Sequence, residues 1–330
     1  MKLKWSVKGH SGLKPCFCCV NVIMKGHSAV SAHPSFVCLS DLDSSKFIAV
    51  SDEELWQTQD HLIAQQPLIK KGQLKELETA SGQVCEPLGL MACQELRPFV
   101  KPSKTIYDSW HCYFVGGVAE IELDLLTQQL YNLGYTPAEL ENFCNDAWIP
   151  KQKLKFTDRG LKGMGSDVMR AVFLMHHMCV TVLMPAGVLP LECRSFCCLA
   201  KVVQCLQDMK LFEDIPAQLI DDLEKLQSRH GVLFKLAYGT GPVVPKHHYR
   251  MHVPGQTRKK KMQVDTAVVE RKERLMKSEI QRLPRCDASQ NINIHITVSV
   301  NLAQIDEMEH SPAFGALVGR TVMTENNAAR

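Results

Sequence analysis

Residues 245–252 read PKHHYRMH, and this stretch contains a candidate pair of zinc-binding histidines. His247 and His252 have H-x4-H spacing, and His248 and His252 have H-x3-H spacing. Both spacings occur in histidine pairs that bind one zinc ion. A loop with exposed histidines would show the same pattern, and a pair supplies only half of a tetrahedral site. The other half must come from elsewhere in the chain.

The matching half lies near the N-terminus, where residues 14–19 read KPCFCC. Cys16 and Cys19 have C-x2-C spacing, which lets two thiolates reach one metal ion from a tight turn. The chain has fourteen cysteines and no secretory leader, so reduced or metal-bound thiols are expected rather than disulfides. If the fold brings residue 16 beside residue 250, the two pairs complete one Cys2His2 zinc site. Whether His247 or His248 joins His252 stays open.

The sequence between these pairs predicts mainly helices. Ser51 with Glu54, and Thr136 with Glu139, form capping boxes that open helices. Apolar residues recur at helical spacing in residues 115–133, 166–182, 191–209 and 216–236. Residues 1–40 and 80–105 lack such periodicity, so irregular structure is expected there. In residues 291–300, Ile and Val alternate with polar residues, which predicts a half-buried β-strand.

The predicted fold class is therefore α+β and mostly α. We expect a Cys-rich segment and linker over residues 1–105, a helical region over 106–245, and a basic segment with the histidine pair and the strand over 246–330. Neither a membrane-spanning run nor the apolar core of a signal peptide is recognisable in the sequence. A nuclear or cytoplasmic protein is expected, not a secreted or membrane protein.

Positive charge is concentrated in residues 246–285, which hold twelve Lys/Arg against four Asp/Glu, although the formal net charge of the whole chain is only +3. This distribution fits a basic face for DNA phosphates, although most charge runs are simply solvated surface. The candidate DNA-binding residues are Lys246, Arg250, Arg258, Lys259, Lys260, Lys261, Arg271, Lys272 and Arg274. Residues 258–261 could also act as a nuclear localisation signal.

Two further motifs could carry chemistry. Asp108 and His111 lie three positions apart in YDSWHC, a spacing that lets a carboxylate orient an imidazole; by itself it indicates a helix cap more than a catalytic pair. Glu270 lies in VERKERLMK, where by itself it is best explained as the i,i+4 partner of Arg274.

Four blocks in order give these motifs a common explanation: KGHSGLKPCFCC, YDSWHCYFVGGVAEIEL, PKHHYRMH and VERKERLMK. Together they resemble the DDE-type DNA transposases of the CMC group, of the Plavaka and CACTA type, over roughly residues 5–285. The resemblance implies an RNase H-like core interrupted by a large helical insertion. It implies one zinc ion held by Cys16, Cys19, His252 and either His247 or His248. It also puts Asp108 and His111 in the [C/D]-x2-H block of the insertion, and Glu270 at the catalytic glutamate.

The same resemblance implies two catalytic aspartates before the Cys pair, and only residues 1–15 precede Cys16. We therefore expect a partial RNase H-like core in an N-terminally truncated, transposase-derived protein that binds zinc and DNA without strand-transfer activity. Glu270 alone should hold Mg²⁺ poorly, so Mg²⁺ is expected only in a longer, active form. The alternative is a non-enzymatic, zinc-stabilised protein-interaction module. A homo-oligomer is compatible with either.

Overall fold

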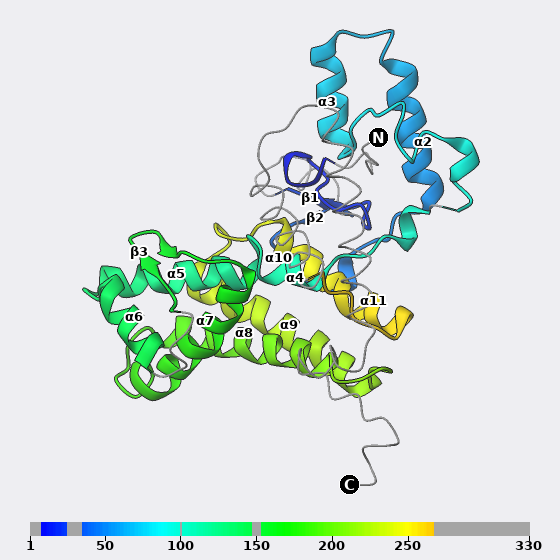
Figure 1. Cartoon of the computed structure of the whole chain (residues 1–330). Coiled ribbons are helices and arrows are strands. Elements are labelled where there is room, and N and C mark those ends of the chain that lie inside the picture. Colours follow the sequence, from blue (N-terminus) through cyan, green and yellow to red (C-terminus); the bar gives the residue numbers. More distant parts are fainter. Residues whose placement is uncertain (1–7, 25–34, 100, 147–152, 267–330) are drawn as a thin grey trace, which may run out of the picture. The chain divides into compact units, whose positions relative to one another are not determined.

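The computed structural model of the chain describes residues 8–24, 35–99, 101–146 and 153–266 (Figure 1). All of these belong to one compact unit, Met1–Thr266. The strand predicted at 291–300 lies outside the described residues. The described part is mostly helical with few, short strands, which agrees with the predicted class.

The α-helices are α2 (Asp52–Gln65), α3 (Lys71–Ser81), α4 (Ser109–Tyr113), α5 (Val118–Asn132), α6 (Pro137–Asp146), α7 (Gly165–Met178), α8 (Pro190–Met209), α9 (Ala217–Tyr238), α10 (Pro245–Tyr249) and α11 (Val253–Lys260). Short 3-10 helices are η1 (Gly9–Ser11), η2 (Ser44–Lys46), η3 (Gln94–Leu96), η4 (Pro102–Lys104) and η6 (Arg250–His252), and a π-helix, η5 (Cys179–Leu183), extends α7. The strands are β1 (Val22–Ile23), β2 (Val37–Cys38), β3 (Phe156–Thr157) and β4 (Gly160–Leu161).

Both predicted capping boxes are present. At the start of α2, the Glu54 amide donates to Ser51 Oγ at 3.1 Å and the Ser51 amide donates to Glu54 Oε2 at 2.8 Å. At the start of α6, the Thr136 amide donates to Glu139 Oε2 at 2.7 Å. Each box gives partners to amides that the helix itself leaves without one.

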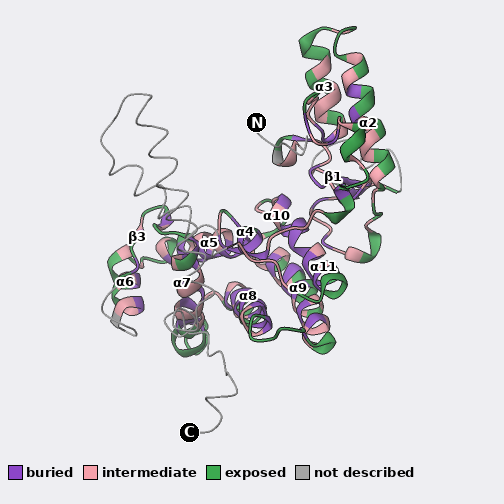
Figure 2. Cartoon of the chain, turned by 45° about the vertical axis from the view of Figure 1, so that its right-hand side comes forward, coloured by how far each residue is buried: buried purple, intermediate pink, exposed green. Residues whose placement is uncertain are grey.

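The helical part of the unit, which we define as α4 to α9, is organised around the antiparallel pair α8 and α9 (Figure 1). The thiols of Cys198 and Cys205 on α8 reach the Leu226 and Leu219 carbonyls of α9 at 3.7 and 3.5 Å, because small side chains allow the two backbones to approach. α5 and α7 pack on the same core, with buried faces turned inward (Figure 2). Leu126 of α5 is fully buried, a burial that stabilises by about 1.5–3 kcal/mol.

Residues 8–24 and 35–40 are more regular than predicted. β1 and β2 pair in parallel, and Val22 and Ile23 are almost completely buried. Two-residue strands are too short to show a period in the sequence. The buried side chain of Asn21 holds the surrounding loops together, because its amide donates to the Ser35 and Lys46 carbonyls and its oxygen accepts from the Ile48 amide, all at 2.9 Å.

Helix α3 was not predicted, and it supports the chain just before Cys16. The Leu13 amide donates to the Thr79 carbonyl at 2.7 Å. α3 ends at Gly82, which has φ +75°, and a Cβ at this position would lie 2.1 Å from the Lys14 carbonyl oxygen. Only glycine allows both this conformation and this close approach, so Gly82 fixes where the KPCFCC turn starts.

Candidate metal centre

The two Cys residues lie on a turn that is held by hydrogen bonds on both sides. The Cys18 amide points at Cys16 Sγ at 3.3 Å, and Cys19 forms a β-bridge with Ala49. The Pro15 carbonyl accepts a hydrogen bond from the Tyr249 hydroxyl at 2.7 Å, which ties the turn to α10. Cys16 and Cys19 are both buried, with 5% and 3% of their surface exposed.

His248 and His252 lie one helical turn apart, across α10 and η6, so their rings project from one face. His252 Nε2 lies 3.3 Å from Cys16 Sγ, 3.5 Å from Cys19 Sγ and 3.1 Å from His248 Nε2. All four donor atoms lie within 4.8 Å of one another. The Cys pair and the His pair therefore meet, which their spacing in the sequence could not establish by itself.

The contacts of the two histidines distinguish them, although both are completely buried. His247 is completely buried, packs on Phe234 with ring centroids 4.7 Å apart, and accepts a hydrogen bond from the Val244 amide at Nδ1. It faces the helical core, and His248 joins the cluster.

These four residues fit a metal ion. In a tetrahedral zinc site with Zn–S near 2.3 Å and Zn–N near 2.0–2.1 Å, donor atoms lie about 3.3–3.8 Å apart. The three separations from His252 Nε2, 3.1 to 3.5 Å, are close to that range. Among the described residues, this is the group of donors that could hold a metal ion, and its Cys2His2 composition is compatible with zinc.

The protonation states also suit a metal. Burial opposes ionisation of Cys16, but hydrogen bonds from Cys18, Cys19, His248 and His252 outweigh it and hold the pKa of the Cys16 thiol well below its ordinary value. Burial lowers the pKa of His248, and the nearby His252 adds to the effect. A thiolate and a neutral imidazole are the forms that bind metal. The hydrogen bond to Cys16 and, as a smaller contribution, burial raise the pKa of the Cys19 thiol. A bound metal ion would displace this proton.

Aromatic side chains pack against the donor residues. The Tyr107 hydroxyl donates to Cys16 Sγ at 3.3 Å, and its ring stacks on Tyr249 at 4.5 Å and on His252 at 5.5 Å. On the other side, Phe47 meets the His248 ring edge-on at 4.5 Å. These rings restrict access of water and orient the ligands, a role that outer-shell partners have in metal sites. The sequence analysis missed Tyr107 and Phe47, although Tyr107 directly precedes Asp108 in the YDSWH block.

A buried ionic network fixes the histidine segment from the helical side. Arg250 lies between the two His donors, and its Nη1 donates to His230 Nδ1 at 2.6 Å. Because arginine has no acceptor, His230 carries its proton on Nε2 and donates it to Glu122 Oε2 at 2.5 Å. None of the three side chains is exposed. Burial lowers the pKa of His230, and the charge of Arg250 adds to this, so a neutral imidazole links the Arg250 cation to the Glu122 anion. Sequence patterns gave no sign of this network.

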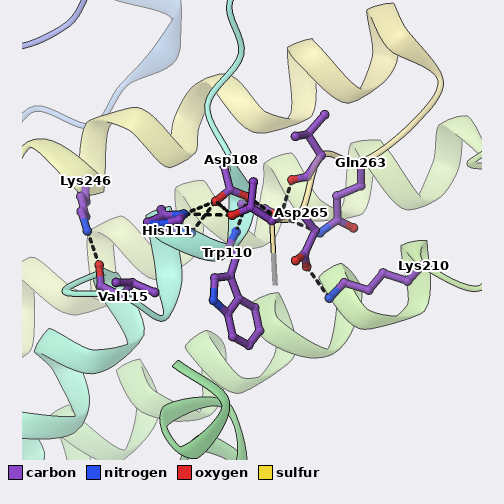
Figure 3. A network of polar contacts seen from close by, with 11 residues as sticks. Asp108, Trp110, His111, Val115, Lys210, Lys246, Gln263 and Asp265 are labelled. Carbon is purple, nitrogen blue, oxygen red and sulfur yellow. Dashed lines mark hydrogen bonds and ion pairs between the residues drawn. The ribbon is translucent and has the colours of Figure 1, made fainter. Parts of the chain in front are cut away.

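Asp108 caps helix α4, as its sequence context favoured, and also binds the segment after α11. It accepts from the Trp110 and His111 amides at 3.1 and 3.0 Å at the start of α4, and its carboxylate also contacts the His111 ring (Figure 3). The Thr266 amide and hydroxyl donate to the same carboxylate at 3.0 and 2.6 Å. These hydrogen bonds outweigh the effect of burial and hold the pKa of Asp108 below its ordinary value.

The segment after α11 is therefore fastened to α4. The Ser109 amide donates to the Val264 carbonyl at 3.1 Å, Gln263 donates to Ser109 Oγ at 2.9 Å, and Asp265 forms an ion pair with Lys210 of the helical part (Figure 3). Asp108 thereby fixes the last described residues of the chain, directly before the block that contains Glu270.

The predicted basic face is only partly available. Arg250 is completely buried, so its assignment to DNA binding was wrong: local charge density does not show that its partners lie on α5 and α9. Lys246 donates to the Val115 carbonyl, and Arg258 pairs with Asp221 and Glu224 on α9. The side chains of Lys259, Lys260 and Lys261 are exposed. Glu270, Arg271, Lys272 and Arg274 lie outside the described residues.

No family of proteins, no curated protein and no solved structure matches this chain. In the described part of the chain, every helix is too short or too polar to cross a membrane.

Proposed function

We propose that this protein is a zinc-stabilised, mostly helical DNA-binding protein of transposase type, with part of an RNase H-like core, and that it binds DNA without transferring strands. The observation that carries the proposal is the convergence of Cys16, Cys19, His248 and His252, which belong to two of the four blocks that resemble the CMC transposases. The donors of Cys16 and His252 are 236 positions apart in sequence, so chance proximity of two matching half-sites is a poor explanation.

The ion would have a structural role. Four protein donors complete the tetrahedral coordination of zinc and leave no open position for a substrate or water, as in structural zinc sites. Such an ion links the N-terminal turn to the segment 245–252, and its binding free energy adds to the free energy of unfolding. We assign no zinc chemistry to the site.

Strand transfer is not part of the proposal, because the resemblance supplies only one of three catalytic carboxylates, Glu270. Two-metal phosphoryl chemistry requires several carboxylates to hold the ions. Incubation of the protein with supercoiled DNA and Mg²⁺ or Mn²⁺ should give no nicks. Nicking that is abolished by Glu270→Gln would overturn this part of the proposal.

The zinc site is tested by elemental analysis of purified wild-type protein, Cys16→Ser and His252→Ala. We expect about one zinc ion per chain in the wild type and loss of zinc from both variants, as four ligands for one ion imply. Cys18→Ser is the matched control, since it removes a thiol from the same turn but not a donor, and it should keep its zinc. Absence of zinc from the wild type, or its retention in both ligand variants, would refute the site.

A second candidate is a zinc-stabilised protein-interaction module. Two candidate DNA-binding arginines are not available in this structure: Arg250 is buried and Arg258 forms an ion pair with Asp221. In addition, the apolar side chains of Leu236 and Leu211 are 62% and 80% exposed, which favours a protein partner. Partner binding of that kind should be nearly insensitive to salt, whereas DNA binding should weaken steeply as salt rises.

A further inference from the structure

Side-chain hydrogen bonds hold the hairpin formed by β3 and β4 against the helical part. A two-residue turn, Asp158–Arg159, joins the strands, whose register pairs Phe156 with Leu161. The Tyr131 hydroxyl donates to the Thr157 carbonyl at 2.9 Å, and Gln128 Nε2 donates to the Asp158 carbonyl at 2.8 Å; both donors lie on α5.

Helix α6 holds the other side of the hairpin. Glu141 accepts from the Phe156 amide at 2.7 Å, and the Asn145 side chain exchanges two hydrogen bonds with Leu154, at 2.9 and 3.2 Å. The hairpin is thus fixed by side chains of two helices, and its position does not depend on its two short strands alone.

The hairpin has an apolar inner face and a basic outer face. Leu154 and Phe156 are buried, with 3% and 5% exposed. Lys153 and Lys155, just before β3, alternate with them in sequence and are exposed. The Lys162 amide donates to the Lys155 carbonyl at 2.8 Å, so these two lysines lie opposite each other across the strands and on the same face.

This basic face lacks neutralising partners within the described residues. No ion pair joins Lys153, Lys155 or Lys162 to any carboxylate of the described chain. Of the nearby acids, Asp158 is exposed in the turn, whereas Glu141 is engaged with the hairpin backbone and Asp124 lies beneath Gly160. Like charges directly opposite each other destabilise a strand pair, and an anionic ligand would remove that cost.

The geometry points to the outer face of the hairpin, Lys153, Lys155 and Lys162, as a binding surface for the phosphate backbone of duplex DNA, supplemented by Arg159 in the turn. This inference rests on the proposed DNA binding and assigns it to a surface that the sequence analysis did not consider. Lysine contacts phosphate as a point charge, so the surface should bind DNA without reading its sequence.

The test compares two variants that each remove three positive charges. One is Lys153→Gln/Lys155→Gln/Lys162→Gln; the matched control is Lys70→Gln/Lys71→Gln/Lys75→Gln at α3, whose exposed lysines lie outside the candidate DNA-binding residues. Binding to a fluorescent mixed-sequence duplex is followed by anisotropy between about 50 and about 200 mM salt. We expect the hairpin variant to lower the magnitude of the slope of log Kobs against log salt by about 2.7, at about 0.9 for each phosphate that a lysine no longer neutralises. The control should keep most of the wild-type slope.

Each outcome has a distinct meaning. If the hairpin variant keeps the wild-type affinity and slope, or if the α3 variant loses as much of the slope, the inference is wrong and the proposed DNA binding stands. If the wild type does not bind DNA, or binds an acidic polypeptide such as polyglutamate instead, both are wrong. Zinc content and melting temperature, measured on all three proteins, show whether each variant is folded and whether the zinc part of the proposal survives independently.

Discussion

Replacing Glu122 by Gln removes the negative charge from a network that lies wholly inside the protein. The glutamine side chain would keep the shape and could still accept the proton of His230, but the buried Arg250 cation would lose its counter-charge. Breaking a buried pair in this way costs about 3–5 kcal/mol, because arginine does not give up its proton. We expect Glu122→Gln to lower the free energy of unfolding by about that amount.

The variant should also affect the metal, because Arg250 lies between His248 and His252. Because the network holds the segment that carries both histidine donors, we expect the zinc affinity to fall as well. Urea unfolding gives the stability, and competition with a chromophoric chelator gives the zinc affinity. Thr127→Val is the matched control: the hydroxyl of this buried residue on the same helix donates to the Leu123 carbonyl, away from the network. Zinc affinity should therefore not change, and stability should change by at most about 1 kcal/mol.

A double-mutant cycle provides the decisive comparison. In Glu122→Gln/Arg250→Met both charges are gone, so the double variant should cost much less than the sum of the two single variants. Additive costs would show that the charges do not interact. An unchanged zinc affinity in Glu122→Gln would show that the network supports the helices alone.

Three other measurements probe the metal site and the hairpin. Chelation of zinc should lower the melting temperature of the wild type but not that of Cys16→Ser, as measured by circular dichroism, since only an intact site can lose an ion. Gly160→Ala should destabilise by about 1–3 kcal/mol in urea unfolding, because Gly160 has φ +116° and a Cβ would lie 2.2 Å from Asp124 Oδ1. Burial, with a contribution from Glu120, raises the pKa of Asp124 from 3.8 to about 6. The folded state therefore binds this proton more tightly than the unfolded state, so Asp124 should destabilise increasingly as pH rises from about 4 to about 6 and by a constant amount above that. The stability of Asp124→Asn relative to the wild type should rise over the same window; no such rise would show that the carboxyl is not desolvated.

Local signals in the sequence predicted local structure well. The capping boxes of Ser51 and Thr136 mark the true starts of α2 and α6, because a cap and its helix are neighbours in sequence. The two halves of the metal site were also recognisable from their spacing. Their closure was not, because it depends on how α2, α3 and the loops around Asn21 place the turn 14–19.

The misassignment of Arg250 has a related cause. In sequence it belongs to a basic run, and its neighbours suggest a solvent-exposed face. Its environment is set instead by His230 and by Glu122, which is 108 positions from His230 in sequence. The hairpin 153–162 was missed for the opposite reason: its strands are only two residues long, and its charges are spread over ten positions rather than concentrated in one run.

Two bridges hold the segment 245–252: the candidate metal site and the buried ionic network of Arg250. On one side His248 and His252 face the thiols of Cys16 and Cys19; on the other, Arg250 is bonded into the helical part through His230. A metal ion bound to the four donors would therefore fix the same short helix that the ionic network fixes. If each bridge positions the segment for the other, their free energies are coupled, and coupling between two sites is reciprocal. The zinc affinity lost in Glu122→Gln should then equal the part of the network's stabilisation that disappears when zinc is removed. Agreement between those two measurements, made on one pair of proteins, would establish the coupling; a difference larger than experimental error would assign the two bridges to independent roles.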